Sequence, residues 1–423
     1  MWAVENLRIN GERLWNSLMD LARIGATPKG GVCRLALTNL DRQGRDLVMQ
    51  WLREAGLTVT VDRIGNIFGR RPGRNLSAPP VVSGSHIDTQ PSGGKFDGNY
   101  GVLAALEVIR TLNEHQVETE APIEVAIWTN EEGTRFTPVM MGSGAFTGVF
   151  GLDDCLARTD LEGKSVGSEL RRIGYECEAA VGARPIAAYF EAHIEQGPIL
   201  EDTGDTIGVV TGALGLRWFD IVLQGQDAHA GSTPMPLRRD ALLAASRLVE
   251  EVNRIALAFQ PDGRGTVGFM QVRPNSRNVV PGEARFSVDL RHAEDAALEK
   301  MERLLREACA RVSGESRIDC GVERVAHSVP VHFDSGCIAA VRDAASGLEL
   351  RHRDITSGAT HDACYLARIA PAGMIFVPCE GGISHAEIEN AKPEDLAAGC
   401  NVLLRAVLGR ATNVTRPALG ISI

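Results

Sequence analysis

Hydrophobic residues near the N-terminus alternate between helical spacing and short β-branched runs. The helical segments are 10–23, 40–55 and 102–115, and the β-branched runs lie near 58–62, 79–85 and 122–128. Amphipathic helices repeat apolar residues about every 3.6 positions, whereas buried strands are short runs rich in branched side chains. Because the two kinds of segment alternate, this part is predicted to be an α/β domain with a mostly parallel sheet.

The pattern changes near residue 206 and returns after residue 328. The strand-like runs in between are DTIGVVTG, LRWFDIVLQG, GTVGFMQV and ARFSVDLR, with helices near 239–259 and 293–312. The first pattern resumes with a helix over 335–346, the strand AGMIFVP (372–378) and a helix over 393–409. We therefore predict an α/β domain, 1–211 with 328–423, and an inserted α+β domain, 212–327.

Composition narrows the class of partner. The 423 residues are 44% hydrophobic and 23% charged, with a net charge of −10, which disfavours nucleic acid and anionic membranes and favours a small molecule. The N-terminus lacks a basic start with an apolar core, and the apolar run GVLAALEVI is interrupted by Glu107. A cytoplasmic location is expected. The nine scattered cysteines form no C-x-x-C pair and are expected to be reduced.

Histidines and carboxylates gather at the predicted strand ends of the α/β domain. SGSHIDT supplies His86 and Asp88, PSGGKFDGN supplies Asp97, IWTNEEG supplies Glu131 and Glu132, EAHIEQG supplies His193, and GGISHAE supplies His385. The carboxyl edge of a parallel sheet is the usual position of a binding crevice. Imidazole together with carboxylate suits Zn²⁺, Mn²⁺, Co²⁺ or Ni²⁺.

Three of these carboxyl groups have specific predicted tasks. Asp97 lies among Gly93, Gly94 and Gly98, so its backbone can approach closely and its carboxylate could bridge two ions roughly 3.5–4 Å apart. Neighbouring side chains on an extended segment point in opposite directions. Glu132 is therefore the expected metal ligand and Glu131 the general base that takes a proton from an activated water.

Each of these signals has a structural alternative when it is taken alone. An isolated histidine such as His86 is more often a hydrogen-bonded structural residue. Adjacent glutamates usually belong to a solvated face, and His193 could fill a half-buried strand. The joint occurrence of all five ligands on one predicted domain favours the metal site.

The chain resembles the M20 family of dinuclear metallopeptidases and amidohydrolases, and within it the hydantoinase/carbamoylase branch. The resemblance covers nearly the whole chain and rests on SGSHIDTQPSGGKFDGNYGV, TNEEGTRF, EAHIEQGPIL, GQDAHAGSTPM, RPNSRNVVPGEARFSVDLRH, SGATHDA and GGISHAE. It implies that Asp97 bridges two ions, that His86 and His193 complete one site, and that Glu132 and His385 complete the other. Asp88 would orient His86 by accepting its N–H.

The resemblance also implies substrate-binding residues. Arg291 matches an arginine that grips a substrate carboxylate, and Gln196, Asn278 and His229 match residues that contact the substrate. His229, in the inserted domain, would stabilise the oxyanion, often in the partner subunit of a homodimer. From the residues alone, Arg291 could equally occupy the polar face of its strand, and His229 could cap a turn before two prolines.

One position departs from the branch. Thr360 stands in SGATHD where the branch usually has glycine, and a β-branched residue narrows the adjoining space. His361 would help to shape the substrate pocket.

The expected activity is metal-dependent cleavage of an N-carbamoyl-L-amino acid to the amino acid, ammonia and CO₂. β-Ureidopropionate, allantoate, ureidoglycolate and N-acyl or N-formyl acids remain alternative substrates. A thiol-nucleophile amidase and a non-catalytic binding protein are the alternatives from other classes.

Overall fold

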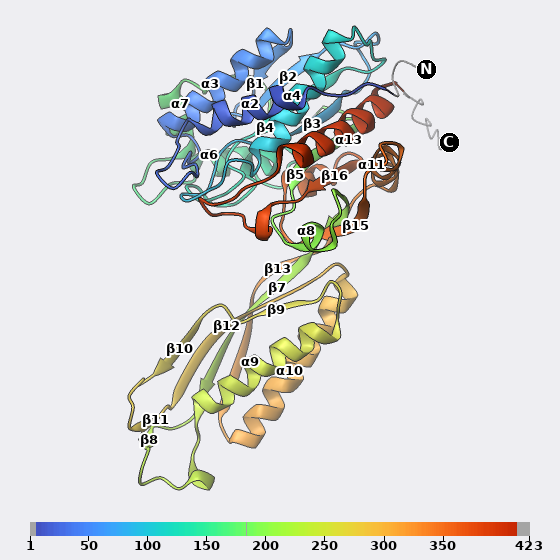
Figure 1. The fold of residues 1–423 in the computed structure, drawn as a ribbon. Helices are drawn as coiled ribbons and strands as arrows, with labels where there is room; N and C mark the ends of the chain where they lie inside the picture. Colours follow the sequence, from blue (N-terminus) through green and yellow to red (C-terminus); the bar gives the residue numbers. More distant parts are fainter. Residues whose placement is uncertain (1–5, 183, 413–423) are drawn as a thin grey trace, which may run out of the picture. The chain divides into compact units, whose positions relative to one another are not determined.

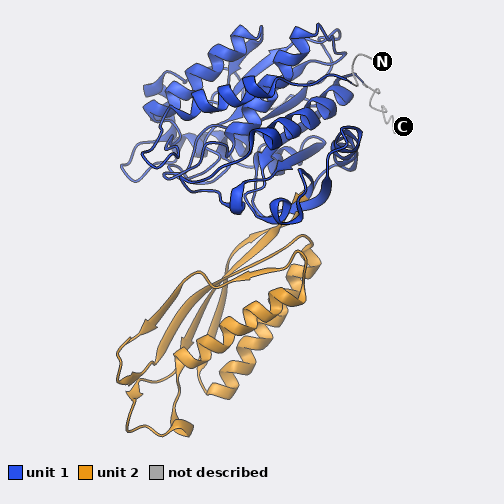
Figure 2. Cartoon of the chain, viewed as in Figure 1, with its two compact units in different colours: residues 1–211, 332–423 blue, residues 212–331 orange. Residues whose placement is uncertain are grey.

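The computed structural model describes residues 6–182 and 184–412. The chain forms two compact units, coloured differently in Figure 2: unit 1 comprises residues 1–211 and 332–423, and unit 2 comprises residues 212–331. Unit 2 thus interrupts the sequence of unit 1. The chain returns to unit 1 a few residues later than the predicted boundary at 327/328, because a strand of unit 2 runs to Ser328.

Unit 1 is built on a nine-stranded sheet with the order β1-β2-β4-β3-β5-β16-β6-β14, in which β15 also pairs with β6. The strands are β1 (Thr58–Val61), β2 (Ile67–Arg71), β3 (Val81–His86), β4 (Ile123–Trp128), β5 (Ala188–Ile194), β6 (Ile207–Ala213), β14 (Val331–His332), β15 (His352–Ser357) and β16 (Ala372–Val377). The neighbours β4, β3, β5 and β16 are parallel, whereas β1, β2 and β6 pair antiparallel. The mostly parallel sheet is confirmed for its centre. β2 follows β1 after a connection too short for a parallel crossover.

Helices cover this sheet and complete the core of unit 1 (Figure 1). They are α2 (Gly11–Ala22), α3 (Asn39–Glu54), α4 (Asn99–Glu114), α5 (Met141–Phe146), α6 (Leu152–Ala157), α7 (Val166–Ile173), α8 (Ile199–Thr203), α11 (Ser335–Gly347), α12 (Asp362–Leu366) and α13 (Pro393–Thr412), with the short η2 (Glu380–Gly382). α4 and α13 contact each other and the central strands. Glu107 of α4 is fully buried and pairs with Arg13 of α2 at 2.7 Å, which explains a charge inside an apolar run.

Unit 2 is an antiparallel sheet with two helices against it. Its elements are β7 (Gly215–Gln224), β8 (Ala228–His229), η1 (Met235–Leu237), α9 (Ala241–Ala258), β9 (Arg264–Thr266), β10 (Met270–Arg273), β11 (Val279–Val280), β12 (Glu283–His292), α10 (Asp295–Ser316) and β13 (Asp319–Ser328). The sheet order is β10-β12-β7-β13, and β9 also pairs with β12. β7 and β12 alternate buried and more exposed side chains, and their buried residues pack with α9 and α10.

One predicted strand of unit 2 is divided, and its first and last strands are neighbours. The run GTVGFMQV was predicted as one strand, but it is divided into β9 and β10, because one extra residue lies between the pairs Thr266↔Asp289 and Met270↔Phe286. The first and last strands of unit 2 are neighbours, since Leu216 of β7 pairs with Ser328 of β13. The chain therefore enters and leaves unit 2 on adjacent antiparallel strands.

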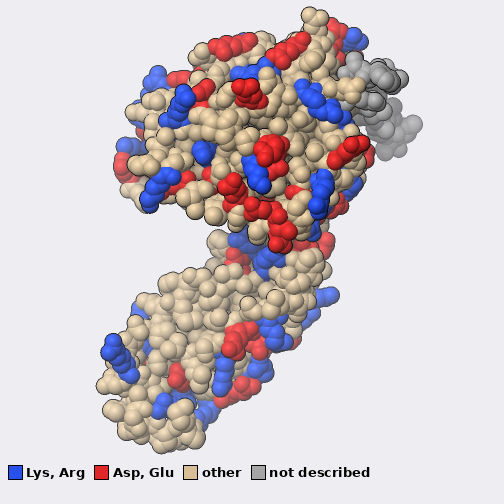
Figure 3. Space-filling model, in the orientation of Figure 1, with Lys and Arg blue, Asp and Glu red and all other residues tan. Residues whose placement is uncertain are grey.

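Charges of both signs are mixed on the surface. On the face drawn in Figure 3, Lys and Arg side chains are interspersed with Asp and Glu on both units. Among the residues that the structure describes, no helix has the length and apolar character needed to span a bilayer.

Candidate metal centre

Four strands of unit 1 bring candidate ligands to one edge of the sheet. β3 ends at His86, β4 leads into Glu131 and Glu132, and β5 contains His193. β16 leads through η2 to the loop with His385. Because these four strands are parallel neighbours, their carboxyl ends meet at the same edge.

Asp97 lies between two groups of these side chains. Its Oδ1 is 3.2 Å from Nε2 of His193 and 3.9 Å from Nε2 of His86. Its Oδ2 is 3.2 Å from Nε2 of His385, and that nitrogen is 3.5 Å from Oε2 of Glu132. The structure thus brings together all five predicted ligands, in two groups that share Asp97 through different oxygens.

The spacing of these donors fits divalent ions. Two ligand atoms on one tetrahedral ion, each bonded at 2.0–2.2 Å, lie about 3.3–3.6 Å apart. Three of the four separations above, 3.2 to 3.5 Å, are close to that value. Mixed imidazole and carboxylate donors suit Zn²⁺, Mn²⁺, Co²⁺ and Ni²⁺. The residues therefore fit two ions that share one carboxylate.

The electrostatics of the group also favour cations. Burial and then neighbouring carboxylates raise the pKa of Glu131 well above its usual value. Burial and then Asp97 raise the pKa of Glu132 to about 8. Burial acts on Asp97 in the same direction, but hydrogen bonds from His193 and His385 outweigh it and hold its pKa well below the usual value. Buried carboxylates that repel one another would be stabilised by bound cations.

The side chains of Glu131 and Glu132 face different ligand groups, but not because they alternate along an extended segment. They lie on a bend after β4, where Asn130 has φ +55°, so the extended geometry expected for them is wrong. Oε2 of Glu131 is 3.6 Å from Nε2 of His86, whereas Glu132 faces His385. Both glutamates are less than 10% exposed, so the alternative of a solvated acidic face is excluded.

The Asp88 carboxylate does not accept the N–H of His86, contrary to what the resemblance implied. Its Oδ1 is 3.9 Å from Nδ1 of His86, beyond hydrogen-bond range, and the backbone carbonyl of Asp88 is the group 2.9 Å from Nδ1. The Asp88 carboxylate instead accepts the backbone N–H groups of Glu131 and Glu132, at 3.2 and 3.3 Å. Asp88 therefore fixes the bend that carries the two glutamates.

Backbone carbonyls orient the two buried histidines of the first group. Nδ1 of His86 lies 2.9 Å from the Asp88 carbonyl, and Nδ1 of His193 lies 2.9 Å from the Ile194 carbonyl. A carbonyl can only accept, so each Nδ1 donates its proton. Nε2 of each ring, which faces Asp97, is then available as a ligand.

Three polar residues of the centre were not predicted from the sequence. Gln90 donates from Nε2 to Oε2 of Glu132 at 2.6 Å and accepts from the Thr134 hydroxyl at 2.8 Å. Ser384 and Glu389 both contact Asp97. The signal available was proximity in sequence, because Gln90 follows Asp88 by two residues and Glu389 follows His385 by four.

Two predicted substrate residues lie at this centre. Nε2 of Gln196 donates to Oδ2 of Asp97 at 3.1 Å. His361 is 3% exposed, its ring centroid is 4.5 Å from that of His193, and burial lowers its pKa well below the usual value. Because its pKa is lowered, the ring of His361 is expected to be neutral. Thr360, between β15 and α12, is exposed.

The other predicted substrate residues belong to unit 2, where they lie in two different sheets. His229 lies in the β8–β11 ladder, where it pairs with Val279, the residue next to Asn278. Arg291 is near the far end of β12, eight residues from Glu283, or about 27 Å at ~3.4 Å per residue. In Figure 1 the β8–β11 ladder and β9, which pairs with that far end of β12, lie at opposite ends of the unit. His229 and Asn278 thus lie together, and Arg291 does not join them.

The contacts of His229 and Arg291 bear on whether these residues have only structural roles. Nδ1 of His229 accepts the backbone N–H groups of Gly231 and Ser232, both at 3.0 Å, so a neutral ring carries its proton on the exposed Nε2. Arg291 is partly exposed and pairs with Asp289 at 2.9 Å. His229 therefore organises its turn and also offers a donor.

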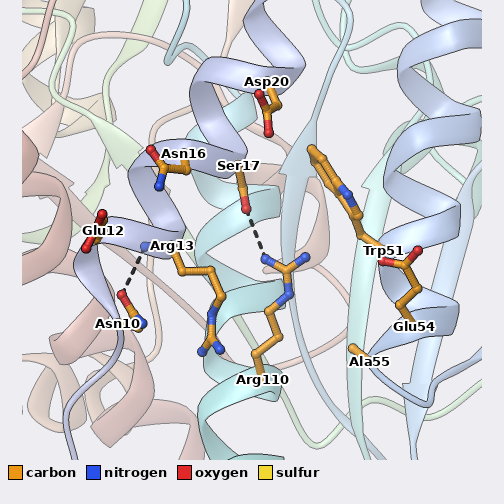
Figure 4. Close-up of a pocket in the computed structure, with 10 residues that line it drawn as sticks. All are labelled: Asn10, Glu12, Arg13, Asn16, Ser17, Asp20, Trp51, Glu54, Ala55 and Arg110. Atoms are coloured by element: carbon orange, nitrogen blue, oxygen red, sulfur yellow. Dashed lines mark hydrogen bonds between the residues drawn. The ribbon is translucent and has the colours of Figure 1, made fainter.

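A groove of about 530 Å³ lies elsewhere in unit 1, among α2, α3 and α4 (Figure 4). In it, Arg110 donates to the Ser17 hydroxyl at 3.0 Å, and Arg13 pairs with Glu107 and Glu114. Its lining has no histidine or cysteine. This groove does not offer the chemistry of the metal centre.

Comparison with known proteins agrees with this geometry. Residues 82–409 match the family model described as peptidase family M20/M25/M40. An N-carbamoyl-L-amino-acid amidohydrolase of Rhizobium meliloti is 49% identical over 96% of this chain and 97% of its own. A ureidoglycolate hydrolase of Arabidopsis thaliana is 34% identical over 94% of this chain and 86% of its own.

A solved structure gives the same result. The crystal structure of a hydantoinase/carbamoylase family amidase from Burkholderia multivorans has a TM-score of 0.95 and 59% identity, covering 96% of this chain and 99% of that one. The family match extends over most of the chain and includes all five residues of the two ligand groups. The chain belongs to the M20 peptidase and amidohydrolase family.

Proposed function

We propose that this protein is a dinuclear metal-dependent amidohydrolase that hydrolyses N-carbamoyl-L-amino acids. The observation that carries the proposal is the pair of ligand groups joined by Asp97, with the Glu131 carboxylate beside them. The full-length similarity to an N-carbamoyl-L-amino-acid amidohydrolase supports this substrate class. The proposal includes the expected homodimer and cytoplasmic location.

The proposed reaction divides its tasks among named residues. His86, Asp97 and His193 would hold one divalent ion, and Asp97, Glu132 and His385 the other. Ions bound there supply a Lewis acid and lower the pKa of a coordinated water.

Glu131 would move the proton in this reaction. It takes a proton from the attacking water as the water oxygen bonds to the carbamoyl carbon, and it delivers that proton to the nitrogen of the amino acid as the C–N bond breaks. The remaining carbamic acid decomposes to ammonia and CO₂. A single carboxylate can take the proton in the first step and return it in the second.

The unit 2 residues would act on the substrate from two subunits. A small ureido acid cannot span the roughly 27 Å of β12 that separates Arg291 from the end nearer His229. If both residues bind one substrate, they must come from different chains of a dimer. Arg291 would hold the carboxylate, and the Nε2–H of His229 would stabilise the oxyanion.

Mixed dimers test this division. Arg291→Ala and His229→Ala homodimers are each expected to be nearly inactive. Unfolding and refolding the two variants together should restore about a quarter of wild-type activity, because half of the dimers are mixed and each mixed dimer has one intact site. No recovery in a mixture shown to contain mixed dimers would contradict sharing of the site.

Gln90 provides a test of the second ligand group. Gln90→Met keeps the side-chain length but removes the donor to Glu132, and loss of such a contact typically lowers metal affinity about 10–100-fold. We expect one of two ions to be lost first in titration with a chelator. The control is Gln50→Met, which removes a similar contact to Glu54 on the surface of α3 and should leave both ions in place. Unchanged affinity in Gln90→Met would contradict the assigned contact.

Substrate screening tests the function as a whole. Metal-stripped protein should release no ammonia, and protein given Mn²⁺, Co²⁺, Ni²⁺ or Zn²⁺ should turn over N-carbamoyl-L-α-amino acids. D enantiomers, β-ureidopropionate, allantoate and ureidoglycolate form the comparison panel. Preference for a member of that panel would change the substrate but keep the chemistry.

The thiol-nucleophile alternative finds no support near this centre. Burial raises the pKa of the Cys364 and Cys379 thiols to about 12, whereas a nucleophilic cysteine needs a lowered pKa. Thiol alkylation under native conditions is expected to leave activity intact.

A further inference from the structure

The loop that carries Asp97 is held by a carboxylate from a distant part of the chain. Oε1 of Glu389 accepts the backbone N–H of Phe96 at 3.0 Å and that of Asp97 at 3.2 Å. These two N–H groups precede α4, so they have no partner within a helix. Glu389 satisfies both of them.

The second oxygen of Glu389 reaches the loop of His385. Oε2 accepts the Ser384 hydroxyl at 2.9 Å, and Ser384 also lies 3.2 Å from Nε2 of Gln196. One carboxylate therefore connects the backbone of the shared ligand Asp97 to the residue beside another ligand, His385.

The space for this carboxylate depends on a glycine. A Cβ added to Gly94 would lie 2.0 Å from Cδ and Oε1 of Glu389, far inside van der Waals contact. The glycine-rich loop thus makes room for the Glu389 side chain itself. This use of Gly94 differs from the backbone freedom suggested by the sequence.

Glu389 is also an unusual residue for the protein interior. It is 1% exposed, and within residues 6–182 and 184–412 no Lys or Arg forms an ion pair with it. A buried carboxylate is costly unless its oxygens are well occupied. The hydrogen bonds of its carboxylate go to the backbone of Phe96 and Asp97 and to Ser384, the residue before His385.

We propose that Glu389 is a positioning residue for the metal centre: its carboxylate fixes the Asp97 loop against the His385 loop, so that each oxygen of Asp97 faces its own ligand group. The inference rests on the proposed function. In this proposal Glu389 acts through the positions of its two oxygen atoms and not through its negative charge. Variants that change only one of these two properties can test it.

The test measures metal bound per chain, with Mn²⁺ as the probe, after loading and gel filtration of the full-length protein, and the Kd by chelator competition. Wild-type protein should hold two ions. Glu389→Ala should weaken retention by about 10–100-fold. Glu389→Gln should stay near wild type, because its oxygen can accept both N–H groups and its amide can donate to Ser384.

The matched control is Asp62→Ala. Asp62 is 2% exposed and likewise accepts two backbone N–H groups, from Ile64 and Asn66, and one side-chain donor, the Asn66 amide. Its loss should lower the melting temperature yet leave two ions bound. If Glu389→Ala lost metal only because the fold was less stable, Asp62→Ala should lose metal as well.

Glu389→Asp keeps the charge but shortens the reach, and it covers the case in which Glu389→Ala does not fold. The inference expects Glu389→Gln to retain metal better than Glu389→Asp, and the reverse order would overturn it. Two ions with unchanged Kd in Glu389→Ala would also overturn it. Absence of metal from the wild-type protein would instead refute the proposed function.

Discussion

Glu131→Gln is expected to lower kcat by about 10²–10⁴-fold while both divalent ions remain bound. Glutamine has nearly the same shape but cannot take a proton from water or return it to the leaving nitrogen. Glu131 is placed for this task because its Oε2 lies 3.6 Å from Nε2 of His86 at the edge of the first ligand group. Steady-state ammonia release and metal analysis of the same preparation are the two measurements.

The neighbouring residue supplies the control for this result. Glu132→Gln should lose an ion, since Glu132 lies with Asp97 and His385 in the second group, and its activity should recover in part at high metal concentration. Glu131→Gln should not respond to added metal. Turnover near the wild-type value in Glu131→Gln would remove the assigned base.

Asp97→Ala is expected to release both ions and to abolish metal-dependent turnover. The groups His86–Asp97–His193 and Asp97–Glu132–His385 have Asp97 in common, so its loss removes a ligand from each. Each ion would keep two protein ligands, whereas stable zinc-type sites use three or four. Metal content after dialysis, and the shift in melting temperature on adding Zn²⁺ or Mn²⁺, would measure the loss.

Variants of ligands that belong to one group only give the metal loss with which Asp97→Ala is compared. His193→Ala and His385→Ala should each lose one ion and retain the other, because each histidine belongs to only one of the two groups with Asp97. If Asp97→Ala lost no more metal than either histidine variant, Asp97 would not be shared. A folded near-ultraviolet spectrum for all three proteins would exclude unfolding as the cause.

The proximity of the five candidate ligands could be predicted because they lie in or just after strands of one sheet, or in the loops that follow them. His86 ends a strand and His193 lies within another, and hydrophobic runs predict such strands well. Parallel neighbours then place these residues at one edge without any knowledge of side-chain contacts. The same reasoning predicted the parallel centre of the sheet.

The supporting contacts could not be predicted, because they depend on side chains far apart in sequence. Glu389 meets the Asp97 loop across 292 residues, and Gln90 meets Glu132 across 42. The bend at Glu131 replaces the expected extended segment because Asn130 adopts a positive φ, which no periodicity reveals. The separation of Arg291 from His229 also required the strand register of unit 2.

The pairing of Leu216 with Ser328 has a consequence for how the chain assembles. Opposed residues in an antiparallel pair lie only about 4.5–5.5 Å apart, so a folded unit 2 brings together two points that are more than a hundred residues apart in sequence. For the rest of the chain, a folded unit 2 is equivalent to a tight turn. Pairing β6 with β14 then no longer carries most of the entropic cost of closing a long loop. An insertion of this kind can be acquired or replaced during evolution without separating the two segments that it interrupts.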